Sequence, residues 1–153
     1  MSTLNDILNF VALDDDIGTS GQPRAEQFST LAAAGYRAVI NLAMPNGENG
    51  LPDEGAIVTS LGMRYVHIPV VWERPTVDDL KTFLGVMQVF AGQKIHVHCA
   101  MNFRVSGFMF HYLRWVRGRD DESARSPMFA RWAPYMDDTW RAFLALTPAD
   151  VAA

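Results

Sequence analysis

Short runs rich in β-branched residues alternate along this chain with longer segments whose apolar residues recur at helical spacing. Turn residues bound the short runs, and Pro, Thr or Gly marks the ends of the longer segments. The pattern predicts strands at residues 36–42, 64–71 and 94–98, and helices at 24–35, 51–62, 75–92 and 105–118. Repeated alternation of strand and helix predicts an α/β fold of three layers, with a mostly parallel central sheet flanked by helices.

Both ends of the chain carry weaker patterns. Residues 9–13 form a weak extended segment, and residues 19–23 (TSGQP) form a cluster of turn residues. The pattern over residues 119–146 predicts two short helices, which we expect to cover the sheet or to form one wall of a site at its edge. The last residues, 149–153, are expected to be a frayed, disordered tail.

Length and composition indicate a single domain, residues 1–153, that needs no disulfide. Hydrophobic residues make up 49% of the chain and charged residues 20%, which is enough apolar surface for a core. The net charge of −4 lacks the basic excess of nucleic-acid and anionic-membrane binders, so neither partner is expected. A single cysteine, and an acidic N-terminus in place of a basic secretory signal, predict a cytoplasmic protein.

Cys99, the only cysteine, directly follows the strand expected at 94–98, and Arg104 comes five positions later. Ligands of open α/β sheets bind beyond the carboxyl ends of the strands, where the amides of a following helix attract an oxyanion. These amides and a nearby guanidinium also favour the thiolate, the nucleophilic form of cysteine. The sequence therefore predicts an anion site with Cys99 as nucleophile and Arg104 as a two-pronged clamp. The other residues expected to bind the substrate are Ala100, Met101, Asn102, Phe103 and Ser106.

The run HCAMNFRVS, residues 98–106, resembles the signature of the cysteine-dependent protein phosphatases of the tyrosine and dual-specificity group. With TSGQP, AVINLAMP and YVHIPVVWERPT, it is similar to a bacterial family of tyrosine-phosphatase-like proteins over residues 17–145. The resemblance implies a phosphatase-like fold and hydrolysis of a phosphate monoester through a thiophosphoryl-enzyme intermediate, without a metal or other cofactor. It implies a phosphorylated substrate, whose class, like the oligomeric state, the residues leave open. By this resemblance Cys99 is the nucleophile, Arg104 the phosphate clamp and His98 a neighbour that tunes the thiolate.

The loop departs from the family signature in three ways. Four residues separate Cys99 from Arg104 where the family has five, so the loop offers one amide fewer to an anion. The loop contains no glycine, and only Asn102 is of a type that tolerates a left-handed backbone. Val105 stands where a hydroxyl residue usually follows the arginine, and Ser106, one position on, could supply that hydroxyl instead.

A phosphatase also needs a proton donor for the leaving oxygen, usually a carboxyl group on the loop after the preceding strand. Thr76 and Asp79 form the expected capping pair of the next helix, and Asp78 suits its first turn. Glu73 is left for the acid role, because the ring of Trp72 beside it could desolvate its carboxyl group.

The same thiol admits other hypotheses. A spacing of four residues also resembles the rhodanese-type sulfurtransferases, which implies a persulfide carried on Cys99. A catalytically silent module would keep the phosphate-binding loop without turnover. The simplest alternative is a buried structural cysteine without any chemistry.

Several other polar residues have ordinary structural interpretations. His96 and His98 have the spacing of metal ligands on a strand, but no carboxylate or second cysteine clusters with them, so no metal site is expected. Asp53 and Glu54 suit charge stabilisation of a helix start. Gln22 belongs to the expected turn.

Overall fold

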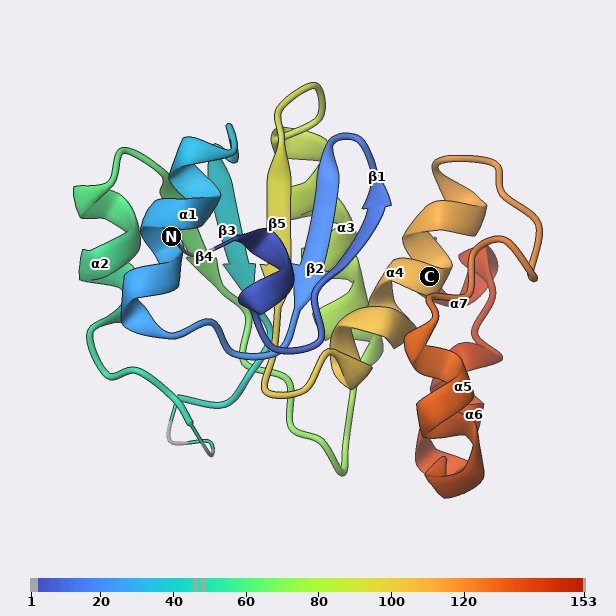
Figure 1. Ribbon diagram of the computed structural model, residues 1–153. Helices are drawn as coiled ribbons and strands as arrows, with labels where there is room; N and C mark the ends of the chain where they lie inside the picture. The colour runs from blue at the N-terminus through green and yellow to red at the C-terminus, as the bar shows by residue number, and fades with distance from the viewer. Residues whose placement is uncertain (1–2, 46, 48, 153) are drawn as a thin grey trace.

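The structure is a computed structural model that describes residues 3–45, 47 and 49–152. A five-stranded sheet with the order β1-β2-β5-β3-β4 runs through its centre (Figure 1). β1 pairs antiparallel with β2, and the other three pairings are parallel. The strands are β1 (Val11–Asp14), β2 (Ile17–Ser20), β3 (Ala38–Asn41), β4 (Arg64–His67) and β5 (Ile95–His98). The mostly parallel sheet predicted from the sequence is confirmed.

Helices cover both faces of this sheet, which confirms the three-layer arrangement (Figure 1). One face carries α1 (Phe28–Ala33) and α2 (Glu54–Ser60), and the other carries α3 (Val77–Val89) and α4 (Phe103–Trp115). The C-terminal helices are α5 (Met128–Trp132) and α6 (Asp138–Leu144), which contact α4, and α7 (Pro148–Ala152), which contacts α3. The described part of the chain also contains three short 3-10 helices, η1 (Leu4–Asp6), η2 (Ala25–Gln27) and η3 (Ala133–Tyr135). Within the described residues, no helix combines the length and the apolar character that a membrane span needs.

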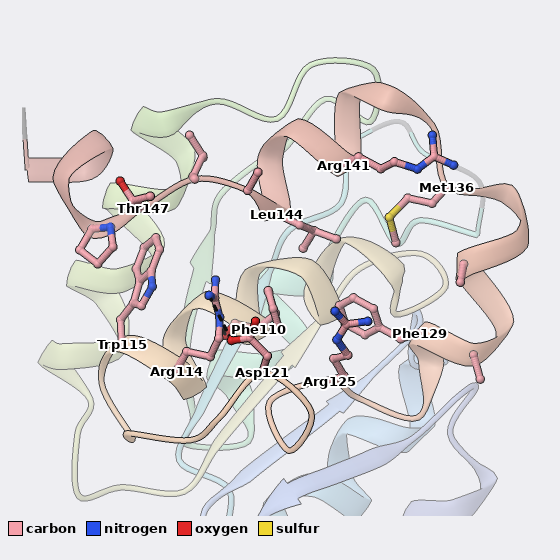
Figure 2. A pocket seen from close by; sticks show the side chains of 15 residues that line it. Phe110, Arg114, Trp115, Asp121, Arg125, Phe129, Met136, Arg141, Leu144 and Thr147 are labelled. Carbon is pink, nitrogen blue, oxygen red and sulfur yellow. Dashed lines mark hydrogen bonds and ion pairs between the residues drawn. The ribbon is translucent and has the colours of Figure 1, made fainter.

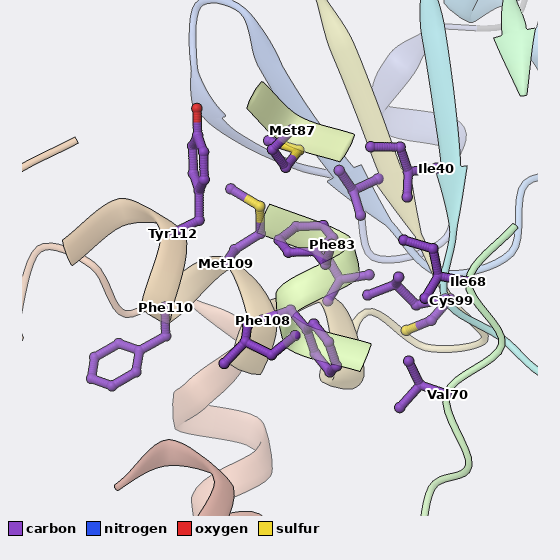
Figure 3. Packing of buried hydrophobic residues seen from close by; sticks show 14 of the residues in the cluster. Ile40, Ile68, Val70, Phe83, Met87, Cys99, Phe108, Met109, Phe110 and Tyr112 are labelled. Atoms are coloured by element: carbon purple, nitrogen blue, oxygen red, sulfur yellow. The ribbon is translucent and has the colours of Figure 1, made fainter. Parts of the chain in front are cut away.

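The core has two parts, one on each face of the sheet. Successive strand residues point to opposite faces, so Val39 packs with the α1 and α2 side and Ile40 with the α3 and α4 side. Figure 3 shows the second part, where side chains of α3 and α4 such as Phe83 and Phe108 meet the sheet. Cys99 belongs to this second cluster, so the thiol lies at the edge of the larger core.

Two segments differ from the sequence-based prediction. The pattern does not predict β2, because Gly18, Thr19 and Ser20 have the polar and flexible character of a turn. The strand forms because tertiary burial outweighs these preferences: all four of its residues are buried, paired in parallel with β5. At the C-terminus, α7 extends to Ala152 where a frayed tail is expected, and Ala153 lies outside the described residues.

Candidate active site at the carboxyl end of β5

Cys99 follows β5 directly, at the carboxyl edge of the central strand of the sheet. Its amide donates to the carbonyl oxygen of Ser20 at 3.3 Å, which extends the β2–β5 ladder by one residue. Cys99 is 1% exposed and packs in the same cluster as Ile68 and Val70 (Figure 3). β2, the strand missing from the prediction, therefore holds the backbone of Cys99 in place.

A small cavity of about 210 Å³ opens beside Cys99. Its walls are formed by Trp72, Cys99, Ala100, Met101, Phe103 and Arg104. The structure thus brings the predicted nucleophile and the predicted clamp to one cavity, together with three of the predicted loop residues. Among its lining residues no carboxylate is present.

Arg104 is held in the cavity wall by its first guanidinium nitrogen. Nη1 donates to the carbonyl oxygen of Val70 at 2.8 Å, and the guanidinium lies 5.9 Å from the ring centroid of Trp72. Its Nε is buried and has no hydrogen-bond partner among the described residues. A buried donor without an acceptor costs free energy, so this arginine retains unused capacity to bind an anion.

The backbone of the loop after Cys99 turns its carbonyl groups to other parts of the protein. The carbonyl oxygens of residues 99–102 face, in order, the Nδ1 of His98, the amide of Gln22, the Nδ2 of Asn9, and the amide and hydroxyl of Ser106. Among the described residues, by contrast, the amides of residues 100–104 have no hydrogen-bond acceptor. Amides at the start of α4 with unused donors form the kind of site that binds an oxyanion.

Asn102 has the left-handed backbone that its residue type makes accessible, with φ of 72°. Its side chain is fully buried and does not line the cavity. Nδ2 donates to the backbone carbonyl oxygen of Asn9 at 2.9 Å and to Oγ1 of Thr19 at 3.2 Å. The hydroxyl of Ser106 donates to the carbonyl oxygen of Asn102 at 2.6 Å, so it is used inside the loop. The side chains of Asn102 and Ser106 therefore shape the loop and do not line the cavity, and their predicted part in substrate binding stays a prediction.

Gly21 packs closely against the backbone of the loop after Cys99, a contact that the sequence does not reveal. A Cβ at this position would lie 2.6 Å from the carbonyl oxygen of Ala100, which is far too close for any side chain. The next residue, Gln22, donates its amide to the same oxygen at 2.9 Å. The segment predicted only as a turn thus packs against the candidate anion loop.

A buried pair between Glu54 and His98 lies behind the loop. Oε2 of Glu54 is 2.6 Å from Nε2 of His98, and both side chains are buried, with exposed fractions of 2% and 0%. Gln22 donates to the other carboxylate oxygen of Glu54 at 2.7 Å. Because Nδ1 of His98 faces the carbonyl oxygen of Cys99, both ring nitrogens face acceptors, an arrangement that an imidazolium satisfies.

Among the groups that lower the pKa of Glu54, His98 contributes most. Burial by itself would raise the pKa of Glu54, but the hydrogen bond and the positive charge of His98, with help from Gln22 and Tyr65, lower this pKa below its ordinary value. The pKa of Tyr65 is raised to about 12, mainly by burial. The hydrogen bond from Asn41 lowers this pKa, and the nearby charge of Glu54 raises it further. The prediction treats Glu54 only as a helix-start charge, because nothing local marks it as a partner of His98.

His96 lies two residues before His98 on β5 and is fully buried. Its Nε2 is 2.8 Å from the hydroxyl oxygen of Ser20. Burial, assisted by the charge of His98, lowers the pKa of His96 well below its ordinary value, so this ring is neutral. Across the described residues, no three His, Cys, Asp or Glu side chains gather in a way that could hold a metal ion.

Glu73, the residue predicted as proton donor, is exposed and does not line the cavity. Its neighbour Trp72 does line the cavity, so the segment is near the site while the carboxyl group is not desolvated. The capping pair is confirmed: Asp79 donates its amide to Oγ1 of Thr76 at 3.0 Å, and Thr76 donates its amide to Asp79 at 3.0 Å. Asp78 is exposed in the first turn of α3.

Comparisons with known proteins include crystal structures that align over nearly the whole chain. No protein-family model matches the chain. The crystal structure named "Putative phosphatase (DUF442)", from Shewanella putrefaciens CN-32, is 32% identical, with a TM-score of 0.83 over 97% of this chain and 94% of that one. The core catalytic domain of the PP-IP phosphatase SIW14 from S. cerevisiae shares the fold, with 18% identity and a TM-score of 0.74 over 94% of this chain and 88% of that one.

Curated relatives align over a shorter part. A "Beta-lactamase hydrolase-like protein" of Xylella fastidiosa is 31% identical over 96 residues, which are 60% of this chain and 22% of that protein. The chain thus spans about a fifth of the length of the curated relatives it matches. The near-complete match to the Shewanella protein and the structural likeness to SIW14 show that the chain belongs to the DUF442 family and has the fold of the cysteine-dependent phosphatases.

Proposed function

We propose that this protein hydrolyses a phosphate monoester, with Cys99 as the nucleophile. The observation that carries the proposal is that Cys99 and Arg104 line one small cavity, at the two ends of a loop whose amides have no acceptor among the described residues. The family match supports the same activity. With about 210 Å³, the cavity is smaller than the roughly 300 Å³ at the lower end of small-molecule sites, so it suits a phosphoryl group more than a whole substrate.

The proposed reaction has two steps. The thiolate of Cys99 attacks phosphorus, a P–S bond forms, and the bond from phosphorus to the alcohol oxygen breaks. The leaving oxygen takes a proton from an acid. Water then attacks the thiophosphoryl group, which releases inorganic phosphate and restores the thiolate. Arg104 and the amides of residues 100–104 would bind the non-bridging oxygens as their charge redistributes.

Glu73 remains the proposal for the proton donor. If it acts, Glu73→Gln slows hydrolysis of alkyl phosphates by about 10²-fold or more, whereas aryl phosphates with good leaving groups lose much less. Asp78→Asn, on the next exposed carboxyl group, is the matched control. Equal small losses for both substrate types in Glu73→Gln would remove Glu73 from the mechanism.

The central test separates binding from chemistry. Cys99→Ser should abolish release of phosphate from p-nitrophenyl phosphate, yet leave vanadate or phosphate binding measurable, because serine is a poor nucleophile without an activating base. Arg104→Lys should impair both, because an ammonium group lacks the planar fork of a guanidinium. Full activity in Cys99→Ser would overturn the assignment.

Sulfur transfer is the second candidate, and the walls of the cavity favour it. Four loop residues separate Cys99 and Arg104, the lining is mostly apolar, and none of the lining residues is a carboxylate. In this reaction the thiolate attacks the outer sulfur of thiosulfate, the S–S bond breaks, and sulfite leaves. Cyanide then takes the sulfur from the Cys99 persulfide as thiocyanate. Neither step needs a proton donor.

Two assays on the same preparation separate the candidates. Phosphate release from aryl phosphates that depends on Cys99 supports the phosphatase, and thiocyanate formation from thiosulfate and cyanide that depends on Cys99 supports sulfur transfer. Phosphate binding that needs Arg104, without either turnover, would identify a silent phosphate-binding module.

A further inference from the structure

A second and larger cleft, of about 720 Å³, lies at the far end of α4 (Figure 2). Phe110 and Trp115 of α4 line it, with Phe129 of α5 and Leu144 of α6. Its volume lies within the roughly 300–1,000 Å³ of small-molecule sites, and its lining is largely apolar and aromatic. The cleft is therefore large enough for a ligand with a substantial apolar body.

This cleft is separate from the cavity beside Cys99. None of the described residues lines both cavities. Both include residues of α4, but Arg104 stands at its start and Arg114 ten residues later near its end. At a rise of about 1.5 Å per residue, the two positions are about 15 Å apart along the helix axis. A ligand in the second cleft would thus be distinct from the group that reacts at Cys99.

Arg114 is fixed at the wall of the cleft by several contacts. Its guanidinium lies 3.9 Å from the ring centroid of Phe110 and forms an ion pair of 3.6 Å with Asp121 (Figure 2). Its Nη2 donates to Nδ1 of His111 at 2.9 Å. Burial lowers the pKa of His111 to about 4, although the hydrogen bond to the carbonyl oxygen of Phe143 raises it. The ring is therefore neutral, and its Nδ1 can accept the hydrogen bond from Arg114. Arg114 is thus pre-organised on an aromatic surface.

Two further arginines line the cleft. Arg125 lies 5.7 Å from the ring centroid of Phe110 and 5.8 Å from that of Phe129, and it forms no ion pair with any described residue (Figure 2). Arg141 pairs at 2.8 Å with the exposed Asp138. The cleft thus has three guanidinium groups and only two carboxylates paired with them, those of Asp121 and Asp138. This local positive excess stands on a chain whose net charge is −4, and it favours an anion.

We propose that this cleft binds an amphiphilic organic anion, a carboxylate whose apolar chain lies on the aromatic floor while its head group reaches Arg125 and the neighbouring arginines. The apolar chain would cover Phe110, Phe129 and Leu144. The proposal is independent of the chemistry at Cys99.

Isothermal titration calorimetry with dodecanoate below its micelle concentration tests the proposal. Dodecanoate should bind at least about tenfold more tightly than dodecanol or dodecyltrimethylammonium, because a charge-assisted hydrogen bond contributes about a factor of ten or more. Acetate, which lacks the chain, should not bind measurably. Equal binding of dodecanoate, dodecanol and the cation, or no binding at all, would overturn the proposal.

Variants locate the binding site. Arg125→Gln should weaken dodecanoate binding by about tenfold, and Ala130→Trp, at an exposed residue lining the cleft, should block it sterically. Arg64→Gln, at an exposed arginine of the edge strand β4, should leave affinity unchanged. Cys99→Ser should also bind normally, and inorganic phosphate should not compete. Unchanged affinity in both cleft variants, or competition by phosphate, would refute this location.

Discussion

The buried pair between Glu54 and His98 gives a sharp prediction for the variant Glu54→Gln. The substitution keeps the shape of the side chain but removes the charge that faces the imidazole at 2.6 Å. It also replaces one acceptor oxygen by an NH₂ group. Two donors, the Nε2 of His98 and the Nε2 of Gln22, then face a single oxygen. While Nε2 of His98 keeps its proton, one of these two donors loses its acceptor inside the protein.

The expected loss of stability follows from this count. A buried donor without an acceptor costs about 1–3 kcal/mol, so we expect a loss of stability of about 1–3 kcal/mol. With a urea m-value near 2 kcal/mol/M, the unfolding midpoint should fall by about 1 M. Asp53→Asn removes the same charge from the adjacent exposed residue and should stay within about 0.5 kcal/mol of the wild type.

The pH dependence provides a second signature of the pair. The pKa of Glu54 is lowered in the folded protein from its ordinary value of 4.5, so the carboxylate stabilises the fold above that pH. This contribution is lost as the pH falls through the lower pKa of the folded state. The stability difference between wild type and Glu54→Gln should therefore shrink below about pH 4.5. A difference that is as large in acid as at neutral pH, or an equal cost for Asp53→Asn, would refute the argument.

Three further predictions concern the loop and the core. Gly21→Ala places a methyl group 2.6 Å from the carbonyl oxygen of Ala100. The free energy of unfolding, measured by thermal denaturation, should fall by about 1–3 kcal/mol, and Cys99-dependent activity should also fall. Unchanged values for both would contradict this packing. Asn102→Ala should destabilise more than Asn102→Gly by about 1–2 kcal/mol, because only glycine adopts φ of 72° without strain; equal losses in urea titrations would show that the side-chain bonds dominate. The pKa of His111 is lowered from 6.5 to about 4 by burial, so stability is complete above pH 6.5 and should fall by up to about 3 kcal/mol towards pH 4, a slope that His111→Asn should reduce.

The candidate site could be predicted where its parts are neighbours in the sequence. Cys99, the loop and Arg104 follow one strand and start one helix, so the strand and helix patterns alone place them at one edge of the sheet. The left-handed backbone of Asn102 and the capping pair of Thr76 with Asp79 were predictable for the same reason. Backbone conformation and capping depend on residue type over a few positions, which any sequence displays.

Tertiary structure decided the contacts between distant segments. The sheet order places β2 and β3 on either side of β5. Only for this reason does Glu54 pair with a histidine 44 positions away, and does Gly21 pack against the loop that follows β5. Burial likewise turned the flexible residues of β2 into a strand and left Glu73 exposed. Such contacts depend on which surfaces the whole chain buries together, and local residue preferences carry no information about that choice.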